Sequence, residues 1–206
     1  MDAPRYGPYA QHPPKFIAGA RGLDFINTVE WRTDPDARVE RLSDYAELAT
    51  WCAKAGLISA AEARRLIGAA HRQPQRARAV LRQAIDLRET CVALLRHPQE
   101  ARPIRALDRR LQAVHCRPTL EIGPDGVLQS GLAPVGPALD RPLALIALEL
   151  VSFLGSRRVE HVRLCANPRC GWMFIDTSRN HSRRWCEMAT CGNRSKARAH
   201  YVRRFA

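Results

Sequence analysis

Four cysteines near the C-terminus form the pattern with the clearest chemistry in this chain. Cys165-Ala-Asn-Pro-Arg-Cys170 and Cys186-Glu-Met-Ala-Thr-Cys191 are two thiol pairs with the same four-residue gap, fifteen residues apart. Cysteine thiolates are strong ligands for Zn²⁺, and two short-spaced pairs can complete one tetrahedral shell. The spacing therefore predicts a closed, structural zinc site. Its expected ligands are Cys165, Cys170, Cys186 and Cys191.

The other histidines and cysteines offer weaker alternatives. His161, His181 and His200 are near enough in sequence to replace a ligand, but four cysteines already complete the shell. The other interpretation is four buried free thiols. The polar composition of this segment argues against it. The chain has seven cysteines, and the remaining three fall on apolar helical faces, which is typical of core residues. They are Cys52, Cys91 and Cys116.

Positive charge is concentrated in the last quarter of the chain. Residues 157–206 contain twelve Lys and Arg against three acids, whereas residues 1–156 contain twenty-one against seventeen. Most of the net charge of +13 thus lies in the segment that contains the four cysteines. A basic module beside a metal site is typical of binding to nucleic acid or another polyanion. A solvated, arginine-rich surface is the alternative interpretation.

Apolar periodicity and capping residues predict mainly helices ahead of the cysteines. The stretch Leu23–Trp31 reads as a first helix with a large apolar face. Ser43 and Ser59 are placed to cap the second and third helices, and Pro74 suits the first turn of the fourth. Apolar residues at three- and four-residue steps indicate two more helices. These cover residues 104–114 and 143–154.

A short β-hairpin interrupts this helical series. Thr119–Ile122 and Val127–Ser130 read as its strands, because Gly123-Pro124-Asp125-Gly126 between them is rich in turn residues. The fold class expected is therefore mainly α, with a helical N-terminal domain that includes a small hairpin, followed by a small zinc module. A module of this size builds little core, so metal binding supplies most of its folding free energy, about 10–16 kcal/mol in comparable fingers.

The cysteine motifs and the first helix resemble a known family. The runs Cys165-Ala-Asn-Pro-Arg-Cys170-Gly-Trp172, Asp176-Thr-Ser-Arg-Asn180, Arg184-Trp-Cys186 and Cys191-Gly-Asn-Arg194 resemble the CGNR zinc finger. The run Leu23-Asp-Phe-Ile-Asn-Thr28 resembles the opening of the helical ABATE domain that precedes that finger. The resemblance implies a treble-clef-like zinc ribbon that binds DNA, in a family described as stress-related transcription regulators. It implies the same four cysteines as ligands.

The domain division expected from these patterns has three parts. Residues 1–15 hold four prolines and read as a flexible arm. Residues 16–156 form the helical ABATE-like domain, and residues 160–206 form the CGNR-type finger.

Basic residues around the second cysteine pair are the candidate contacts to nucleic acid. A helix expected over Arg194–Phe205 presents cations, while Ala197, Tyr201 and Phe205 form one stripe that can pack inward. Arginines on a helix suit the DNA major groove, and the Ser178–Arg184 loop has the composition of a phosphate clamp. The candidates are Arg179, Arg183, Arg184, Arg194, Lys196, Arg198, Arg203 and Arg204.

The leading hypothesis is a zinc-dependent DNA-binding protein that regulates transcription. In it the finger contacts DNA, and the helical domain senses a small-molecule ligand or forms a homodimer. The alternatives are an RNA-binding protein, a protein-interaction adaptor, or a small-molecule-binding helical domain with an accessory finger. Asp24 and Asn27 are the polar candidates for a ligand site in that domain, and helix capping or core anchoring explains them equally well.

Enzymatic activity and a membrane location are not expected. A four-cysteine shell leaves no open metal position, and no Ser-His-Asp group or glycine-rich phosphate loop is recognisable. The N-terminal residues contain no apolar run typical of a signal peptide, and no segment has eighteen uninterrupted apolar residues. We therefore expect a cytoplasmic protein, where thiols stay reduced and available to metal.

Overall fold

The computed structural model describes residues 8–9, 11–114, 116–135 and 138–205. Contacts within the chain divide it into two compact units. The first unit is Met1–Arg41 together with Phe153–Ala206, and the second unit is Leu42–Ser152. The first unit thus joins an N-terminal segment to the cysteine-rich segment, two parts that the sequence predicts as different domains. The expected boundary at residues 156–160 lies near one division point, but the division at residue 41 was not expected.

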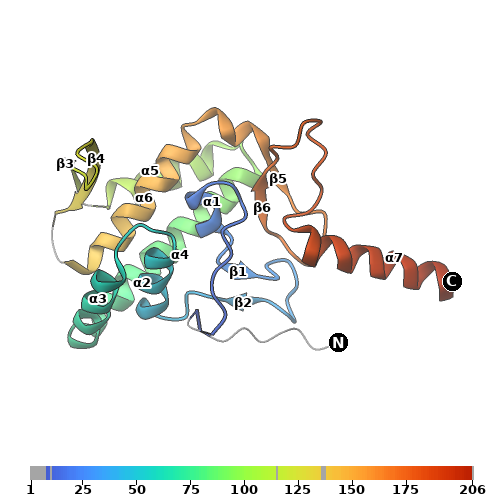
Figure 1. Ribbon diagram of the computed structural model, residues 1–206, viewed down its shortest axis with the longest axis horizontal. Coiled ribbons are helices and arrows are strands. Elements are labelled where there is room, and N and C mark those ends of the chain that lie inside the picture. The colour runs from blue at the N-terminus through green and yellow to red at the C-terminus, as the bar shows by residue number, and fades with distance from the viewer. Residues whose placement is uncertain (1–7, 10, 115, 136–137, 206) are drawn as a thin grey trace. The chain divides into compact units, whose positions relative to one another are not determined.

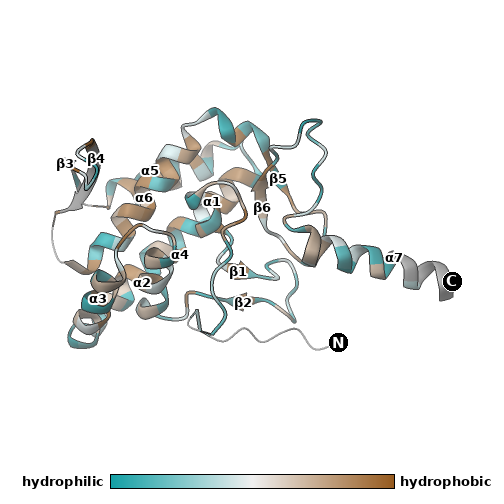
Figure 2. Cartoon of the chain, viewed as in Figure 1, coloured by the Kyte–Doolittle hydropathy of each residue, from teal (hydrophilic) through white to brown (hydrophobic). Residues whose placement is uncertain are grey.

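Five helices build the second unit (Figure 1). They are α2 (Tyr45–Lys54), α3 (Ala60–Arg72), α4 (Pro74–Arg96), α5 (Ala101–Gln112) and α6 (Arg141–Leu154), which ends in the first unit. Their apolar faces bury a core in which Leu48, Trp51, Val80, Leu87 and Ile146 are almost completely shielded from solvent. Figure 2 shows hydrophobic residues along α6, which agrees with the apolar helix predicted there. No helix in the described part of the chain has the length and apolarity needed to cross a membrane.

Local signals for the ends of these helices are mostly confirmed. The Ser59 side chain accepts a hydrogen bond from the backbone N–H of Glu62 at 3.0 Å, and Pro74 begins α4. At α2 the cap is Asp44 and not Ser43, since the Asp44 carboxylate accepts from the N–H of Glu47 at 2.9 Å. A carboxylate at this position also interacts favourably with the positive end of the helix dipole.

The predicted hairpin is present and longer than expected. Strands β3 (Cys116–Ile122) and β4 (Leu128–Pro134) pair antiparallel, with Ile122 opposite Leu128. Gly126 has a φ of 75°, a conformation that glycine adopts without a steric penalty, and it closes the turn. The side chain of Cys116, expected in the core, lies outside the described part of the structure.

The first unit contains short elements and one longer helix. Helix α1 (Arg21–Ile26) is followed by the antiparallel pair β1 (Val29–Glu30) and β2 (Val39–Glu40). The second antiparallel pair, β5 (Val162–Leu164) and β6 (Met173–Ile175), comes after a 3₁₀ turn, η2 (Arg157–His161). A single turn, η3 (Met188–Gly192), then leads directly into α7 (Asn193–Phe205).

The first helix ends earlier than the predicted Leu23–Trp31. It stops at Ile26. Trp31 comes after strand β1, and the φ of Trp31 is 50°. Thr28 and Asn27 explain the early end. The Thr28 hydroxyl donates to the carbonyl of Phe25 at 2.8 Å, and the Asn27 amide bonds to backbone outside the helix. Polar side chains that bind backbone in this way compete with helix continuation.

Helix α7 does not pack as the sequence predicts. Ala197 is exposed, Tyr201 is 65% exposed, and the side chain of Phe205 lies outside the described part. In the described part of the chain, the element with which α7 is most in contact is the turn η3 at its own N-terminus. The described side chains of α7 are therefore available to solvent along most of the helix.

Candidate metal centre and nucleic-acid interface

The first cysteine pair lies in the connection between β5 and β6. The backbone N–H of Cys165 donates to the carbonyl of Trp172 at 2.8 Å, and the N–H of Cys170 donates to the carbonyl of Asn167 at 3.0 Å. Gly171 has a φ of 69°, and a Cβ there would come within 2.9 Å of the Cβ of Arg32. Glycine is therefore required both by the turn and by the close approach of the N-terminal segment.

The second pair comes from the loop after β6 and from η3. Cys186 ends the loop, and Cys191 lies within η3, immediately before Gly192 and α7. A Cβ at Gly192 would collide with the side chain of Met188. Since Met188 is 54% exposed and flexible, the obstacle is a side chain that can move.

The four cysteine sulfurs converge on one point. All four residues are buried, and their Sγ atoms lie within 4.8 Å of one another. The Cys170–Cys186 and Cys186–Cys191 sulfurs are 3.7 and 3.6 Å apart. A tetrahedron of sulfurs about 2.3 Å from a zinc ion has edges of about 3.8 Å, whereas a disulfide would bring two sulfurs to about 2.05 Å. The donor set and its spacing thus fit Zn²⁺.

Neighbouring N–H groups point at these sulfurs. The amide Nδ2 of Asn167 donates to Cys191 Sγ, and the backbone N–H of Cys186 donates to Cys165 Sγ, both at 3.5 Å. The sulfurs also affect each other, because hydrogen bonding with Cys170 lowers the pKa of Cys165, while the same contact raises the pKa of Cys170. Thiols this close compete for protons, and a divalent cation that binds all four removes the competition.

Two of the three histidines considered as alternative ligands, His161 and His181, lie elsewhere, and the side chain of His200 lies outside the described part of the structure. Among the described residues, the four cysteines form the one group of His, Cys, Asp and Glu side chains with metal-binding geometry. His161 and His181 instead stack on each other, with ring centroids 4.9 Å apart. The two described core cysteines behave as predicted. Both Cys52 and Cys91 are fully buried, and burial raises the pKa of Cys91 to about 12.

Aromatic side chains complete the core around the cysteines. Trp172 and Phe174 are buried against the cluster, and Trp185 packs on it while partly exposed. Ile17, from the N-terminal segment, joins this core. The metal centre is therefore built from two parts of the chain that are far apart in sequence.

Polar contacts attach the N-terminal segment to the finger. Asn27 holds the backbone of Met173 at both ends, donating to its carbonyl at 2.8 Å and accepting from its N–H at 2.9 Å. The indole N–H of Trp172 donates to the carbonyl of Val29 at 2.8 Å. The N–H of Arg32 donates to the carbonyl of the ligand Cys170 at 3.0 Å. We call this set the clasp; no local sequence signal reveals it.

Asp24 and Asn27, the two polar candidates for a ligand site, are thus anchoring residues. Asp24 Oδ1 accepts a hydrogen bond from the N–H of Ala18 at 2.9 Å, and only 5% of the residue is exposed. Burial outweighs that hydrogen bond and raises the pKa of Asp24 to about 6. Ala18 in turn accepts from the N–H of Ile175 at 2.8 Å, which links this turn to β6.

Asp176, within one of the family-like motifs, organises the loop before the second cysteine pair. Its Oδ1 accepts from the N–H and hydroxyl of Ser178, at 2.9 and 2.6 Å, and its Oδ2 accepts from the N–H of Arg183 at 3.0 Å. Hydrogen bonding from Ser178 lowers the pKa of Asp176, so the carboxylate stays ionised in this role.

Comparison with known families matches both parts of this arrangement. The model of the CGNR zinc finger matches residues 161–204. The ABATE model, described as "Putative stress-induced transcription regulator", matches residues 19–157, about two thirds of the chain. The chain belongs to the ABATE family. It has no match among curated proteins.

The family boundary and the spatial boundary do not coincide in this ABATE protein. The segment 19–41 belongs to the ABATE match by sequence and to the unit of the CGNR finger by contacts. Neither family description names a catalytic activity. The zinc-binding finger is shown by the match together with the cysteine cluster.

The predicted nucleic-acid contacts of the CGNR finger divide into three groups. Arg179, Arg184, Arg194, Lys196 and Arg198 are exposed, and they are spread over the loop and the first turns of α7. Arg183 is half-buried and serves the fold. Arg203 and Arg204 belong to α7, but their side chains lie outside the described part.

Arg183 is committed to the backbone of its own module. Its guanidinium lies 4.3 Å from the ring centre of Phe174 and donates to the carbonyl of Trp185 at 3.0 Å. It also donates to the carbonyl of the ligand Cys186. These bonds fix the loop that carries Cys186, so the side chain has little capacity left to clamp a phosphate.

Two other arginines meet at Trp31. The Arg194 guanidinium lies 4.5 Å from the centre of a Trp31 ring, and that of Arg169 lies 6.0 Å from it. Arg169 also forms an ion pair with Asp34, and this hydrogen bond holds the pKa of Asp34 below its usual value. The N-terminal segment thus contributes to the charge distribution around the metal centre.

Proposed function

We propose that this ABATE protein is a zinc-dependent DNA-binding transcription regulator whose C-terminal finger contacts DNA. The observation that carries the proposal is the position of α7. This helix begins directly after the metal ligand Cys191, and its described side chains from Arg194 to Arg198 are mostly exposed cations. A bound metal would therefore fix the base of a basic helix, which is how several DNA-binding modules present a helix to the major groove.

The size of α7 supports this role. Its thirteen residues span about 20 Å at about 1.5 Å per residue, enough to lie along one turn of a groove. Among its described side chains, Arg194, Lys196 and Arg198 are exposed cations, and Arg179 and Arg184 lie on the preceding loop. In the proposal α7 enters the groove, where Lys196 and Arg198 contact phosphates along its edge, and the two loop arginines bind further phosphates. Arg183 is left out because its guanidinium is occupied.

The remaining parts of the proposal concern regulation and location. The helical second unit senses a ligand or forms a homodimer, and the protein acts in the cytoplasm. The family description as a transcription regulator supports a regulatory role for the chain as a whole.

Salt-dependent binding to duplex DNA tests the proposal. The zinc-loaded full chain is titrated with a fluorescent mixed-sequence duplex at several salt concentrations, beside the double variant Lys196→Ala/Arg198→Ala. Each lost phosphate contact reduces the slope of log K against log salt by about 1, so the double variant should lose about 2. Binding at low salt should weaken at least tenfold.

Two controls make the result specific. Arg64→Ala/Arg65→Ala removes two exposed cations from α3 and gives the same change in net charge. It should leave the slope and affinity unchanged. Equal losses of affinity in both double variants would mean that overall charge, and not α7, determines binding. Binding of single-stranded RNA in preference to the duplex would favour the RNA-binding alternative. Genome-wide capture of bound DNA, with Cys191→Ser as the control, then identifies the sites.

A further inference from the structure

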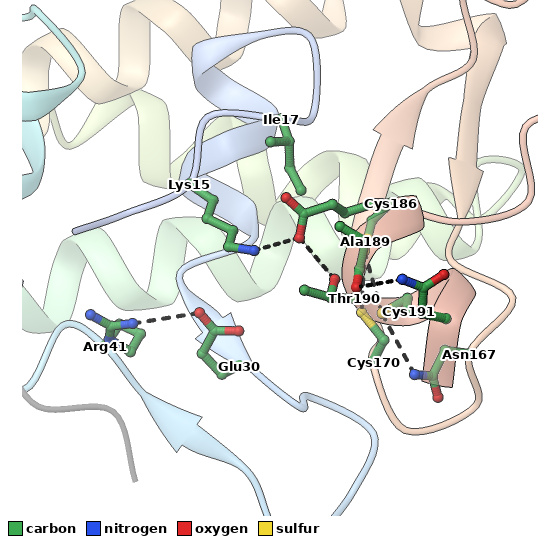
Figure 3. Close-up of polar contacts among 12 residues, drawn as sticks. Lys15, Ile17, Glu30, Arg41, Asn167, Cys170, Cys186, Ala189, Thr190 and Cys191 are labelled. Atoms are coloured by element: carbon green, nitrogen blue, oxygen red, sulfur yellow. Dashed lines mark hydrogen bonds and ion pairs between the residues drawn. The ribbon is translucent and has the colours of Figure 1, made fainter. Parts of the chain in front are cut away.

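A cavity of about 380 Å³ lies beside the metal centre, inside the first unit. One wall comes from the finger and includes the ligands Cys170, Cys186 and Cys191, together with Trp172. The opposite wall comes from the N-terminal segment and includes Trp31. In Figure 3, Lys15, Glu30 and Arg41 occupy the N-terminal side of this region, and the labelled cysteines occupy the finger side.

The cavity is much larger than a metal ion requires. A zinc ion fits between four sulfurs that already lie within 4.8 Å of one another. The remaining volume extends to Pro13, Pro14 and Trp31, away from the sulfurs. Cavities that bind small molecules measure about 300–1,000 Å³ and combine apolar walls with a few polar groups. This cavity has that size and that composition.

Two indoles line the cavity, and only one has its N–H satisfied. Trp172 Nε1 donates to the carbonyl of Val29 at 2.8 Å. Trp31 Nε1 is buried and has no hydrogen-bond partner among the described residues. Buried donors are nearly always paired in folded proteins, so an unpaired one in a cavity wall indicates a missing acceptor. The φ of 50° at Trp31 is rare for a bulky residue, and strained backbone of this kind is found at turns and at ligand-binding sites.

Cations gather on the N-terminal side of the cavity. Lys15 and Arg41 line it there together with the carboxyl group of Glu30, while Arg194 lines it from α7. Lys15 also forms an ion pair with Glu187 of the finger. Arg41 lies 3.5 Å from Glu30, yet burial raises the pKa of Glu30 to about 7, so this carboxyl is only partly ionised near neutral pH. Metal-bound thiolates would add negative charge on the opposite wall. The electrostatic potential is therefore more positive at the N-terminal wall than at the wall of the finger. This difference favours a ligand that has an apolar body and an anionic end directed toward Lys15 and Arg41.

We propose that this cavity binds a small planar aromatic carboxylate. Its ring lies against Trp31 and the two prolines, a carboxylate oxygen accepts the hydrogen bond of Trp31 Nε1, and its charge is balanced by Lys15 and Arg41. The site differs from the one expected in the helical domain, since none of the residues that line it belongs to the second unit. It occupies the interface between the ABATE N-terminal segment and the CGNR finger.

Calorimetric titration of the zinc-loaded full chain tests the site without DNA. The probes are naphthoate and benzoate, and naphthamide serves as the uncharged isostere of naphthoate. We expect saturable, one-to-one binding of naphthoate below millimolar concentration, with naphthamide at least tenfold weaker. Absence of binding by both acids at millimolar concentration, or equal binding of the amide, overturns the proposal.

Variants locate the binding in the cavity. Trp31→Phe keeps an aromatic ring but removes the N–H, and it should weaken naphthoate about tenfold. Lys15→Gln, which also removes the solvent-exposed ion pair with Glu187, should weaken it about fivefold, and zinc content shows whether the finger stays folded. Arg38→Gln removes an exposed cation of the same segment outside the cavity and should change nothing. Unchanged affinity in Lys15→Gln, with zinc content intact, contradicts the assigned site.

Binding here also predicts a link to the proposed DNA contact. Arg194 lines the cavity and belongs to α7, so a ligand beside it would change how the base of that helix is held. This consequence rests on the proposed function: naphthoate should alter duplex affinity in the intact chain and should not do so in Trp31→Phe. If the chain binds naphthoate but no DNA, the site stands and the DNA proposal fails.

Discussion

Different interactions stabilise the interior of each of the two units. The second unit buries aliphatic and aromatic side chains such as Trp51, Leu87 and Ile146 between helices. The first unit buries four cysteines with Trp172 and Phe174, and it adds apolar residues such as Leu23 and Phe25 and a set of polar contacts between its two segments. One unit therefore depends on apolar burial, which needs no cofactor. The other depends on a metal and on the clasp, so the two should lose structure under different conditions.

Metal removal should separate the two units most strongly. Chelation, or Cys191→Ser, should abolish stoichiometric zinc and unfold the first unit, because metal binding supplies on the order of 10 kcal/mol to modules of this kind. The second unit should keep its helices. Segment-resolved hydrogen exchange with zinc analysis measures both effects.

The matched control is a cysteine of the other unit. Cys91→Ala removes an equally buried thiol and should cost about 1 kcal/mol in the second unit while leaving one zinc per chain. If chelation unfolded both units together, the comparison drawn above would be wrong.

A core truncation should give the opposite pattern. Leu87 is 1% exposed in α4, and Leu87→Ala removes its packing within the second unit. We expect a loss of about 2–5 kcal/mol in the free energy of unfolding of that unit, with zinc affinity unchanged. Denaturant melts followed by helical circular dichroism, beside a zinc competition assay, distinguish the two readouts.

The sequence predicts the metal centre well because its signal is local. Each cysteine pair is set by a short gap, and the turn and core residues around it, Asn167, Gly171 and Trp172, lie within a few positions of a ligand. The helices of the second unit are predicted for the same reason, since their periodicity and caps are contained in single segments. The prediction of Ser43, where the structure has Asp44 as the cap of α2, is the small error there.

The clasp could not be predicted, because its partners are far apart in the chain. Asn27 and Met173 are 146 positions apart, and neither residue type signals a partner at such a distance. For the same reason the apolar pattern of Leu23–Trp31 wrongly predicts that the first helix continues to Trp31. Arg183 illustrates a second limit: composition marks an arginine as a candidate for phosphate, and only the fold shows that carbonyls have taken its donors.

Breaking the clasp sharpens the comparison by acting on the first unit without touching the metal ligands. Asn27→Ala leaves the N–H and C=O of Met173 buried and unpaired, which should cost about 2–4 kcal/mol in the first unit. The second unit should be unaffected. Asn180→Ala, at an exposed asparagine of the same unit, is the matched control and should be neutral. Proteolysis protection of the N-terminal segment and the finger reports the loss; equal protection in both variants would argue against the clasp.

The smallest expected effect is a pH dependence confined to the first unit. The pKa of Asp24 is raised by burial from 3.8 to about 6, so the folded state binds a proton more tightly than the unfolded state. Protonation of Asp24 therefore stabilises the folded state. This stabilisation is complete below the pKa of the unfolded state and is lost as pH rises through about 6. Between about pH 5 and pH 7.5, where zinc stays bound, the wild type should lose about 1 kcal/mol relative to Asp24→Asn. Denaturant midpoints of both zinc-saturated proteins measure this difference, and parallel pH profiles would mean that Asp24 ionises equally in both states.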